Sequence, residues 1–217
     1  MLKELLSRIN KRYPLASVDS PEFDGLKVSH MKFRIKSYEA RGLGAISVMT
    51  AVGFFGLMKM ETLIVLPREL DLPLLSYDRI HAFGKETIIL DLYDTFINPC
   101  DLNKLDRIKE EYRSFTPYEK EKGWYDAINL PQTTALKGKK KAAPQFDELC
   151  RRFFDAYLEI PADPVTDIET KKKKTAAYRE GLLKNGGTST DVFVKELGRE
   201  KTEKLYEEIL FRTEAAK

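Results

Sequence analysis

Apolar and polar residues alternate through the first half of the chain. Over residues 28–38, Met31, Phe33 and Ile35 alternate with basic residues, which is the period of a half-buried β-strand. Short turn signals separate four further strand-like runs, at residues 43–51, 57–66, 74–82 and 86–93. Because such short connections leave no room for crossovers, the five strands are expected to form an antiparallel meander.

Helical periodicity marks the start of the chain and the part beyond residue 100. The first helix is expected to end near Tyr13. Two amphipathic helices flank an irregular stretch at 116–143; their apolar positions are Leu102, Leu105, Ile108 and Tyr112 in one, and Phe146, Leu149, Phe153 and Tyr157 in the other. Segregated strands and helices predict an α+β fold, an α/β/α sandwich with a central antiparallel sheet flanked by helices.

Three more helices are expected in the last third of the chain. The first runs to about Lys184 and is broken at residues 185–187. A short helix ending at Gly198 follows, and the last helix runs to about Arg212. The residues available to cap the short helix are Thr188, Ser189 and Thr190.

The composition is that of a globular protein. The 217 residues are 42% hydrophobic and 33% charged, which excludes a disordered tail or a fibre and favours one domain over residues 1–217. With 37 basic and 34 acidic residues, the net charge of +3 is too small to indicate a general binder of polyanions. The uncharged stretch at 42–58 is interrupted by glycines and shorter than the roughly 20 residues of a bilayer span. We therefore expect a cytoplasmic protein without a membrane partner.

Signatures of familiar catalytic and metal sites are missing. The chain has no glycine-rich nucleotide loop, no serine nucleophile elbow and no HExxH motif. Cys100 and Cys150 form no metal-binding pattern, and His30 and His81 lie far apart in sequence. A histidine-centred catalytic site or a metal site is therefore not predicted.

Two lysine runs allow two interpretations. They are Lys137 with 139–141, and 171–174. They can be a solvated loop and a solvated helix start, or a basic rim that attracts an acidic partner or phosphate groups. No aromatic residues are interleaved with the lysines, as they would be on a surface for single-stranded nucleic acid, so no nucleic-acid partner is expected.

Asp78 is the most informative carboxylate. It lies in an otherwise apolar run, LPLLSYDRI, where burial would be costly unless the carboxylate were paired or protonated. It either points to solvent or enters a pocket, where desolvation would raise its pKa as a general acid working at pH 7 requires. Glu61, in the neighbouring run, could face it across the sheet and form a pair of pocket carboxyls.

The order of several segments resembles the ferredoxin-dependent bilin reductases, the family of phycocyanobilin:ferredoxin oxidoreductase, to which red chlorophyll catabolite reductase is related. LPRELDLPLLSYDRI at 66–80 is similar to the family's segment with the catalytic aspartate, and ILDLYD at 89–94 to its next strand. GWYDAIN around Trp124, FDELCRRFFDAYLEI at 146–160 and the region 178–211 resemble the later segments in the same order. The resemblance extends over most of the chain.

The resemblance implies an activity and a set of site residues. Members of the family reduce linear tetrapyrroles such as biliverdin with single electrons from ferredoxin, and they use no flavin, nicotinamide or metal. By resemblance, Asp78 is the proton donor, Glu61 a second pocket carboxylate, and Asn185 and Trp124 substrate-binding positions. The implied partners are a bilin and ferredoxin, an acidic iron–sulfur protein that the lysine runs could attract.

Three positions depart from the family pattern. Glu61 stands where members have histidine or asparagine facing the catalytic aspartate, and Gly186 follows Lys184-Asn185 where many have aspartate. Val48 and Met49 occupy the place of a glutamate in phycocyanobilin-forming members. These departures motivate an alternative, a non-catalytic tetrapyrrole-binding or carrier protein of the same fold. A binder of nucleic acid or phosphate ligands through the lysine runs is a third, weaker alternative.

Overall fold

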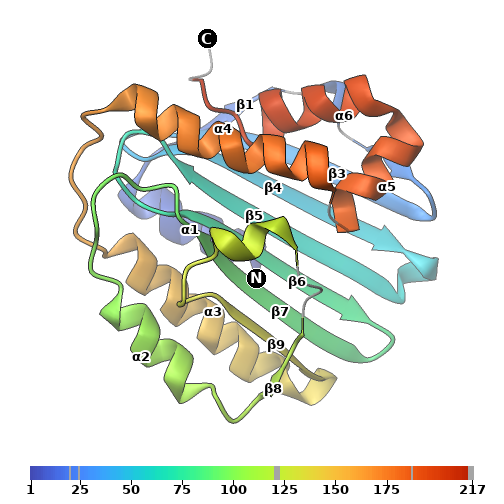
Figure 1. Cartoon of the computed structure of the whole chain (residues 1–217). Helices are drawn as coiled ribbons and strands as arrows, with labels where there is room; N and C mark the ends of the chain where they lie inside the picture. The colour runs from blue at the N-terminus through green and yellow to red at the C-terminus, as the bar shows by residue number, and fades with distance from the viewer. Residues whose placement is uncertain (20, 24, 120–122, 187, 215–217) are drawn as a thin grey trace.

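A single antiparallel sheet organises the molecule (Figure 1). The computed structural model describes residues 1–19, 21–23, 25–119, 123–186 and 188–214. Within these residues the sheet has the strand order β1-β3-β4-β5-β6-β7-β9-β8, and β2 pairs with β3. The strands are β1 (Leu15–Val18), β2 (Lys27–Val28), β3 (Met31–Ala40), β4 (Gly44–Gly53), β5 (Met58–Pro67), β6 (Leu74–Ala82), β7 (Lys85–Tyr93), β8 (Thr116–Pro117) and β9 (Thr134–Lys139).

The predicted meander is confirmed, since β3 to β7 pair in chain order and all antiparallel. The prediction of an irregular stretch over 116–143 is wrong. This stretch contains β8 and β9, and β9 pairs with β7 along Lys85–Leu90. The sequence of β9, TALKGK, is short and half polar, so it carries no clear alternation. Its place is set by pairing with the free edge of β7.

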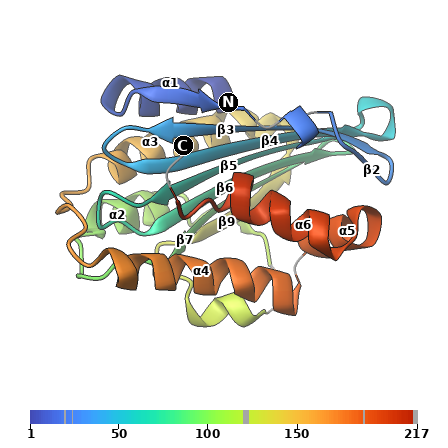
Figure 2. The same cartoon turned by 90° about the horizontal axis from the view of Figure 1, so that it is seen from above.

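The helices form a layer on each face of the sheet (Figure 2). They are α1 (Leu2–Arg12), α2 (Asn103–Glu111), α3 (Ala143–Leu158), α4 (Ile168–Asn185), α5 (Thr188–Leu197) and α6 (Arg199–Leu205), with 3-10 turns η1 (Pro21–Phe23), η2 (Phe54–Gly56), η3 (Trp124–Ala127) and η4 (Lys140–Ala142) and the π-helical turn η5 (Tyr206–Leu210). The expected helices are therefore present. Thr188 and Ser189 begin α5. The structure does not describe their side chains, which were expected to cap this helix, and it does not describe Gly187.

The first face of the sheet packs against α1, α2 and α3. Alternate residues of the central strands, such as Leu63, Tyr77 and Leu90, share one apolar core with these helices. The Tyr157 hydroxyl of α3 donates to the Pro73 carbonyl at 2.8 Å. Arg79 bonds to Glu86 on the neighbouring strand and to Asp147 on α3. Apolar burial and partly buried ion pairs together fix α3 on this face.

The second face packs against α4, α5, α6 and η5. Phe33, Met49 and Ile64 point to this side and share a second core with the last helices. The hydroxyl of Ser47 donates to the Leu210 carbonyl at 3.0 Å, which fixes η5 against β4. Figures 1 and 2 show α4 crossing this face beside η3, while α5 and α6 lie over β3 and β4. On this face Ile80, Ile89 and Ala135 of β6, β7 and β9 are half-buried.

Gly44 allows the close approach of β4 to the end of β5. Its φ is +144°, and a Cβ would lie against the Leu66 carbonyl oxygen and 2.6 Å from the backbone nitrogen of Arg68. By contrast, Gly198 has φ +81° and open space around the Cβ position. The first glycine is required by both packing and conformation, and the second by conformation alone.

We expect Gly44→Ala to lower the free energy of unfolding by about 2 to 5 kcal/mol, because it adds a backbone clash to an unfavourable φ. Gly198→Ala should cost only about 1 kcal/mol. Urea denaturation of both variants measures the two changes. Equal destabilisation by the two substitutions would contradict the packing argument.

Candidate functional site

Asp78 lies on the second face of the sheet, half-buried near the middle of β6. It pairs in register with Thr62 of β5, and the Thr62 hydroxyl donates to its carboxylate at 2.5 Å. The Ser76 hydroxyl lies 3.4 Å from the other carboxylate oxygen. Two hydroxyls therefore orient the carboxyl group on the side of the sheet that faces α4.

The sheet around Asp78 presents half-buried apolar side chains. Ile89 is its neighbour in register on β7, and Ala135 follows on β9. One row further along, Met60 and Ile80 pair on the same face. All four are half-buried, unlike their counterparts on the first face, where Leu63, Ile88 and Leu90 are fully buried. A flat apolar ligand that covered this surface would lie against the carboxyl group of Asp78.

A second carboxylate, Asp91, lies on the same face two strand positions along β7. It is buried, and Ser76 pairs with it in register, so Ser76 stands between the two aspartates. The hydroxyl of Tyr93 donates to Asp91 at 3.1 Å. The Tyr93 ring lies 4.3 Å from that of Tyr178 on α4, centroid to centroid. These residues form a polar cluster between the sheet and α4.

The two phenols of this cluster hold their protons firmly. Burial is the main cause that raises the pKa of Tyr93 well above its usual value, and Tyr178 and Asp91 add to the shift. The pKa of Tyr178 is also raised, first by burial and then by the charges of Asp91 and Asp78, although its hydrogen bond with Tyr93 opposes this. Both groups are therefore neutral hydrogen-bond donors near pH 7.

Trp124 and Asn185 lie at the C-terminal end of α4. The indole of Trp124 packs so closely over Gly181 that no Cβ would fit there, and its nitrogen donates to the Gly186 carbonyl at 3.4 Å. Its ring lies 5.8 Å from that of Tyr178. Trp124 therefore borders the polar cluster through its contact with the Tyr178 ring. Asn185, by contrast, is exposed on the last turn of α4.

The expected pairing of Glu61 with Asp78 is wrong. Glu61 pairs in register with Arg79 and points to the first face, where the Tyr77 hydroxyl lies 3.5 Å from its carboxylate and the N-terminal amine 4.0 Å. Successive residues of a strand point to opposite faces, so an error of one position moves a side chain through the sheet. Thr62, not Glu61, faces Asp78.

Gly186 has a carboxylate against it. A Cβ on Gly186 would meet Oδ1 of Asp191, whose carboxyl carbon would lie 3.2 Å away. Gly186 also has φ +77°, which most side chains avoid. Asp191 of α5 therefore occupies the space that a side chain at position 186 would enter. Gly186 and Asp191 come together at the break between α4 and α5, which a local sequence pattern does not predict.

No family model matches the sequence, and no curated protein matches it. Solved structures do match, among them selenomethionine-labelled phytochromobilin synthase from tomato in complex with biliverdin. The TM-score is 0.75 at 14% sequence identity, over 98% of this chain and 82% of the tomato chain. The chain has the fold of phytochromobilin synthase. The predicted α+β sandwich is thereby confirmed.

The likeness to phytochromobilin synthase supports the resemblance to bilin reductases at the level of the fold, and it does not single out one member. The helices of the described part of the chain include none that is long and apolar enough to cross a bilayer.

The second lysine run is not a uniform basic surface. Lys171 is buried, donates to the Leu72 carbonyl at 2.6 Å and lies 3.5 Å from Asp71. Lys174 bonds to Asp94 at 2.8 Å and to the Phe96 carbonyl at 2.6 Å. Lys171 thus holds α4 against the loop before β6, and Lys174 holds it against the loop that follows β7. Lys171 and Lys174 therefore have structural roles, and the attraction of an acidic partner by this run stays a prediction.

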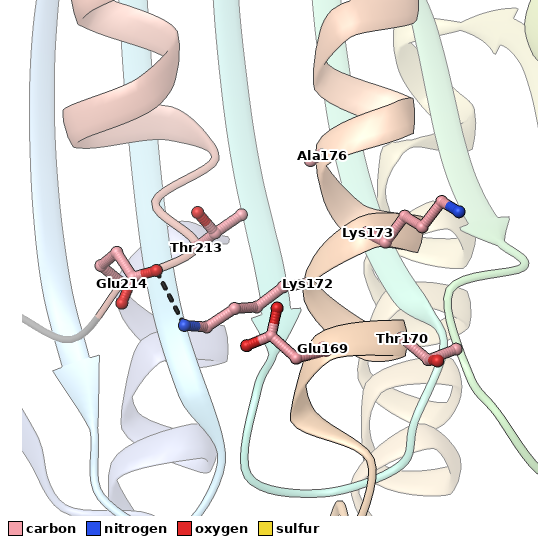
Figure 3. A pocket seen from close by; sticks show the side chains of 7 residues that line it. All are labelled: Glu169, Thr170, Lys172, Lys173, Ala176, Thr213 and Glu214. Atoms are coloured by element: carbon pink, nitrogen blue, oxygen red, sulfur yellow. Dashed lines mark ion pairs between the residues drawn. The ribbon is translucent and has the colours of Figure 1, made fainter.

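A cleft of about 490 Å³ lies beside the first turns of α4 (Figure 3). Its lining includes Lys172, Lys173 and Glu169 of α4 and Thr213 and Glu214 near the end of the chain. Lys172 and Glu214 form an ion pair of 2.9 Å. Its lining includes neither Asp78 nor Asp91, and its charges are mixed, so the polar cluster is the better candidate site.

Lys171 makes stability depend on pH. Burial lowers its pKa to about 8 from 10.5, although Asp71 opposes the shift. Burial alone would raise the pKa of Asp71, but the backbone N–H groups of Asn98 and Ile97, together with Lys171, lower it. Between pH 8 and 10.5 the unfolded chain keeps the lysine proton that the folded chain has released, so this lysine's contribution to stability rises with pH.

As pH rises from about 7.5 to about 10, across the Lys171 pKa of about 8, we expect the unfolding free energy of the wild type to increase relative to that of Lys171→Met. Lys173→Met, at an exposed position of the same helix turn, should show no such trend. Thermal or urea unfolding across this range measures both. A difference that stays constant or falls for Lys171→Met would contradict the linkage.

Proposed function

We propose that the protein reduces biliverdin or a related linear tetrapyrrole with single electrons from reduced ferredoxin. The observation that carries this proposal is the position of Asp78, on a half-buried apolar surface in a chain with the fold of a protein solved with biliverdin. A conjugated tetrapyrrole can hold an unpaired electron, so the protein needs to bind it, exclude water and supply protons. We expect no flavin, nicotinamide or metal to be required, and we expect the enzyme to act in the cytoplasm.

Asp78 is the proposed proton donor. Its carboxyl group is held by the hydroxyls of Thr62 and Ser76, and the apolar side chains beside it can exclude water from a bound ring. A carboxyl group at hydrogen-bond distance from a pyrrole nitrogen or a carbonyl oxygen could donate its proton to the reduced bilin.

Asp91 is the proposed second acid, in the role first expected of Glu61. It is buried on the same face as Asp78, and Ser76 lies between them in register. The Tyr93 and Tyr178 phenols, whose pKa values are raised, connect Asp91 to α4. A proton could therefore be replaced at Asp78 from within the cluster after the first transfer.

Asp78→Asn should bind biliverdin but lose turnover by about 100-fold or more, because the amide cannot donate an acidic proton. The measurement is an anaerobic absorbance time course with biliverdin, before and after adding reduced ferredoxin. Glu61→Gln, on the opposite face, is the matched control and should keep its turnover.

Two results would contradict the reductase, and a third would contradict only the assignment of Asp78 as the proton donor. A bound spectrum of the wild type that stays fixed after ferredoxin is added would favour a carrier protein. No spectral change on mixing with biliverdin would exclude both the reductase and the carrier. Full turnover by Asp78→Asn would remove the proposed donor.

Asp91→Asn should retain biliverdin binding and accumulate a partly reduced bilin, since the later proton transfer would slow on the order of tenfold or more. Stopped-flow spectra in the presence of reduced ferredoxin would show whether the later phase slows while the first is unchanged. A uniform loss of bound bilin would instead assign Asp91 a structural role, and unchanged kinetics would exclude it from proton transfer.

A further inference from the structure

One end of the sheet gathers turns from distant parts of the sequence. Six residues, one from each of six strands, lie in one row of the register: Met31, Gly53, Met58, Ala82, Lys85 and Lys139. The turns next to these residues all lie at the same end of the sheet. We call this end, with residues 27–32, 54–57, 83–85 and 139–142, the basic tip. It lies at the other end of the sheet from the loop with Asp71, which joins β5 to β6.

Large apolar side chains project from the basic tip. Phe55 is fully exposed, and Phe54, Leu57 and Phe83 are 45%, 54% and 66% exposed. The Phe54 ring lies 6.3 Å from that of Phe83 and 6.1 Å from that of His30, so three separate turns contribute to one patch.

The backbone at these phenylalanines is unusual. Phe54, Phe55 and Phe83 have φ values of +51°, +55° and +50°, in the left-handed region that favours glycine. Each such residue costs stability on the order of 1 kcal/mol or more, and burial of the exposed rings returns little of it within this chain. The rings thus expose apolar surface at strained backbone positions, as is typical of a binding surface.

Cations surround the exposed rings. Lys27 and Lys32 pair across β2 and β3, and with Phe54 and Phe55 they line a surface groove of about 730 Å³. The exposed lysines of the basic tip and of the adjoining strand position are Lys27, Lys32, Lys59, Lys85, Lys139, Lys140 and Lys141. The described residues of the basic tip include no acidic side chain, and Glu86, at the adjoining strand position, is buried against Arg79 and His81. Its occupant must therefore be both apolar and anionic.

These properties distinguish among possible occupants. A second copy of the chain would bring lysines against lysines, which opposes association. Rings on separate projecting turns, rimmed by lysines, match a bilayer surface, where aromatic side chains enter the interface and lysines contact anionic headgroups. We propose that the basic tip binds the surface of an anionic membrane, with Phe54, Phe55 and Phe83 inserted at headgroup depth. This binding is peripheral and needs no membrane-spanning helix.

The test is flotation of the protein with vesicles of phosphatidylcholine, with or without phosphatidylserine. The wild type should bind only the anionic vesicles, and added salt should release it. The double variants Phe55→Ser/Phe83→Ser and Lys140→Gln/Lys141→Gln should each weaken binding on the order of tenfold. Matched controls are Ile168→Ser, an exposed apolar residue at the far end of α4, and Lys3→Gln/Lys11→Gln on α1.

The outcomes separate this proposal from the enzymatic one. No binding to anionic vesicles, equal binding to both vesicle types, or equal losses in the control variants would overturn it. Retention on an acidic ferredoxin that the phenylalanine variant loses, without vesicle binding, would also overturn it and assign the surface to a protein partner. Titration of the same variants with biliverdin should be unchanged, so failure of the membrane proposal leaves the bilin site untouched.

Discussion

The hydrogen-bonded register between β5 and β6 is the constraint on which the candidate chemistry depends. It pairs Thr62 with Asp78 and Glu61 with Arg79, so two carboxylates that are close in the sheet face opposite sides of it. A shift of one residue would exchange the two faces and place a charged arginine against α4. The register is held by apolar packing on both faces, because a slip would expose both cores to water.

The two faces of β6 have different physical roles. On the first face, Arg79 is held by Glu86 and Asp147, and these hydrogen bonds raise its pKa even though burial opposes the charge. These ion pairs keep the strand fixed against α3. On the second face the apolar side chains around Asp78 are only half-buried, and α4 supplies Tyr178 rather than a sealed apolar core. A rigid, filled face thus supports an open one, which suits binding of a flat ligand.

The two lysine runs show how tertiary contacts decide the role of similar sequences. Lys171 and Lys174 each reach a backbone carbonyl and a carboxylate, so they join α4 to the loops at one end of the sheet. Lys139 ends β9 at the opposite end and residues 140–141 follow it, where Lys139 pairs with Lys85 and the backbone N–H of Lys140 donates to the Gly84 carbonyl. One run therefore stabilises the fold, and the other contributes to an exposed basic and aromatic surface.

The sequence by itself determined the elements whose pattern is local: the strand alternation from Met31 to Tyr93, the helical spacing of α1 to α3, and the segregation that makes the fold α+β. It also identified Asp78 as a carboxylate in an apolar strand. Tertiary structure decided which residues face it. Glu61 was predicted on the wrong face of the sheet because the sequence of one strand does not determine its pairing register with the next. The strand β9, the Asp91–Tyr93–Tyr178 cluster and the approach of Asp191 to Gly186 depend on contacts between segments distant in sequence, which a local pattern does not encode.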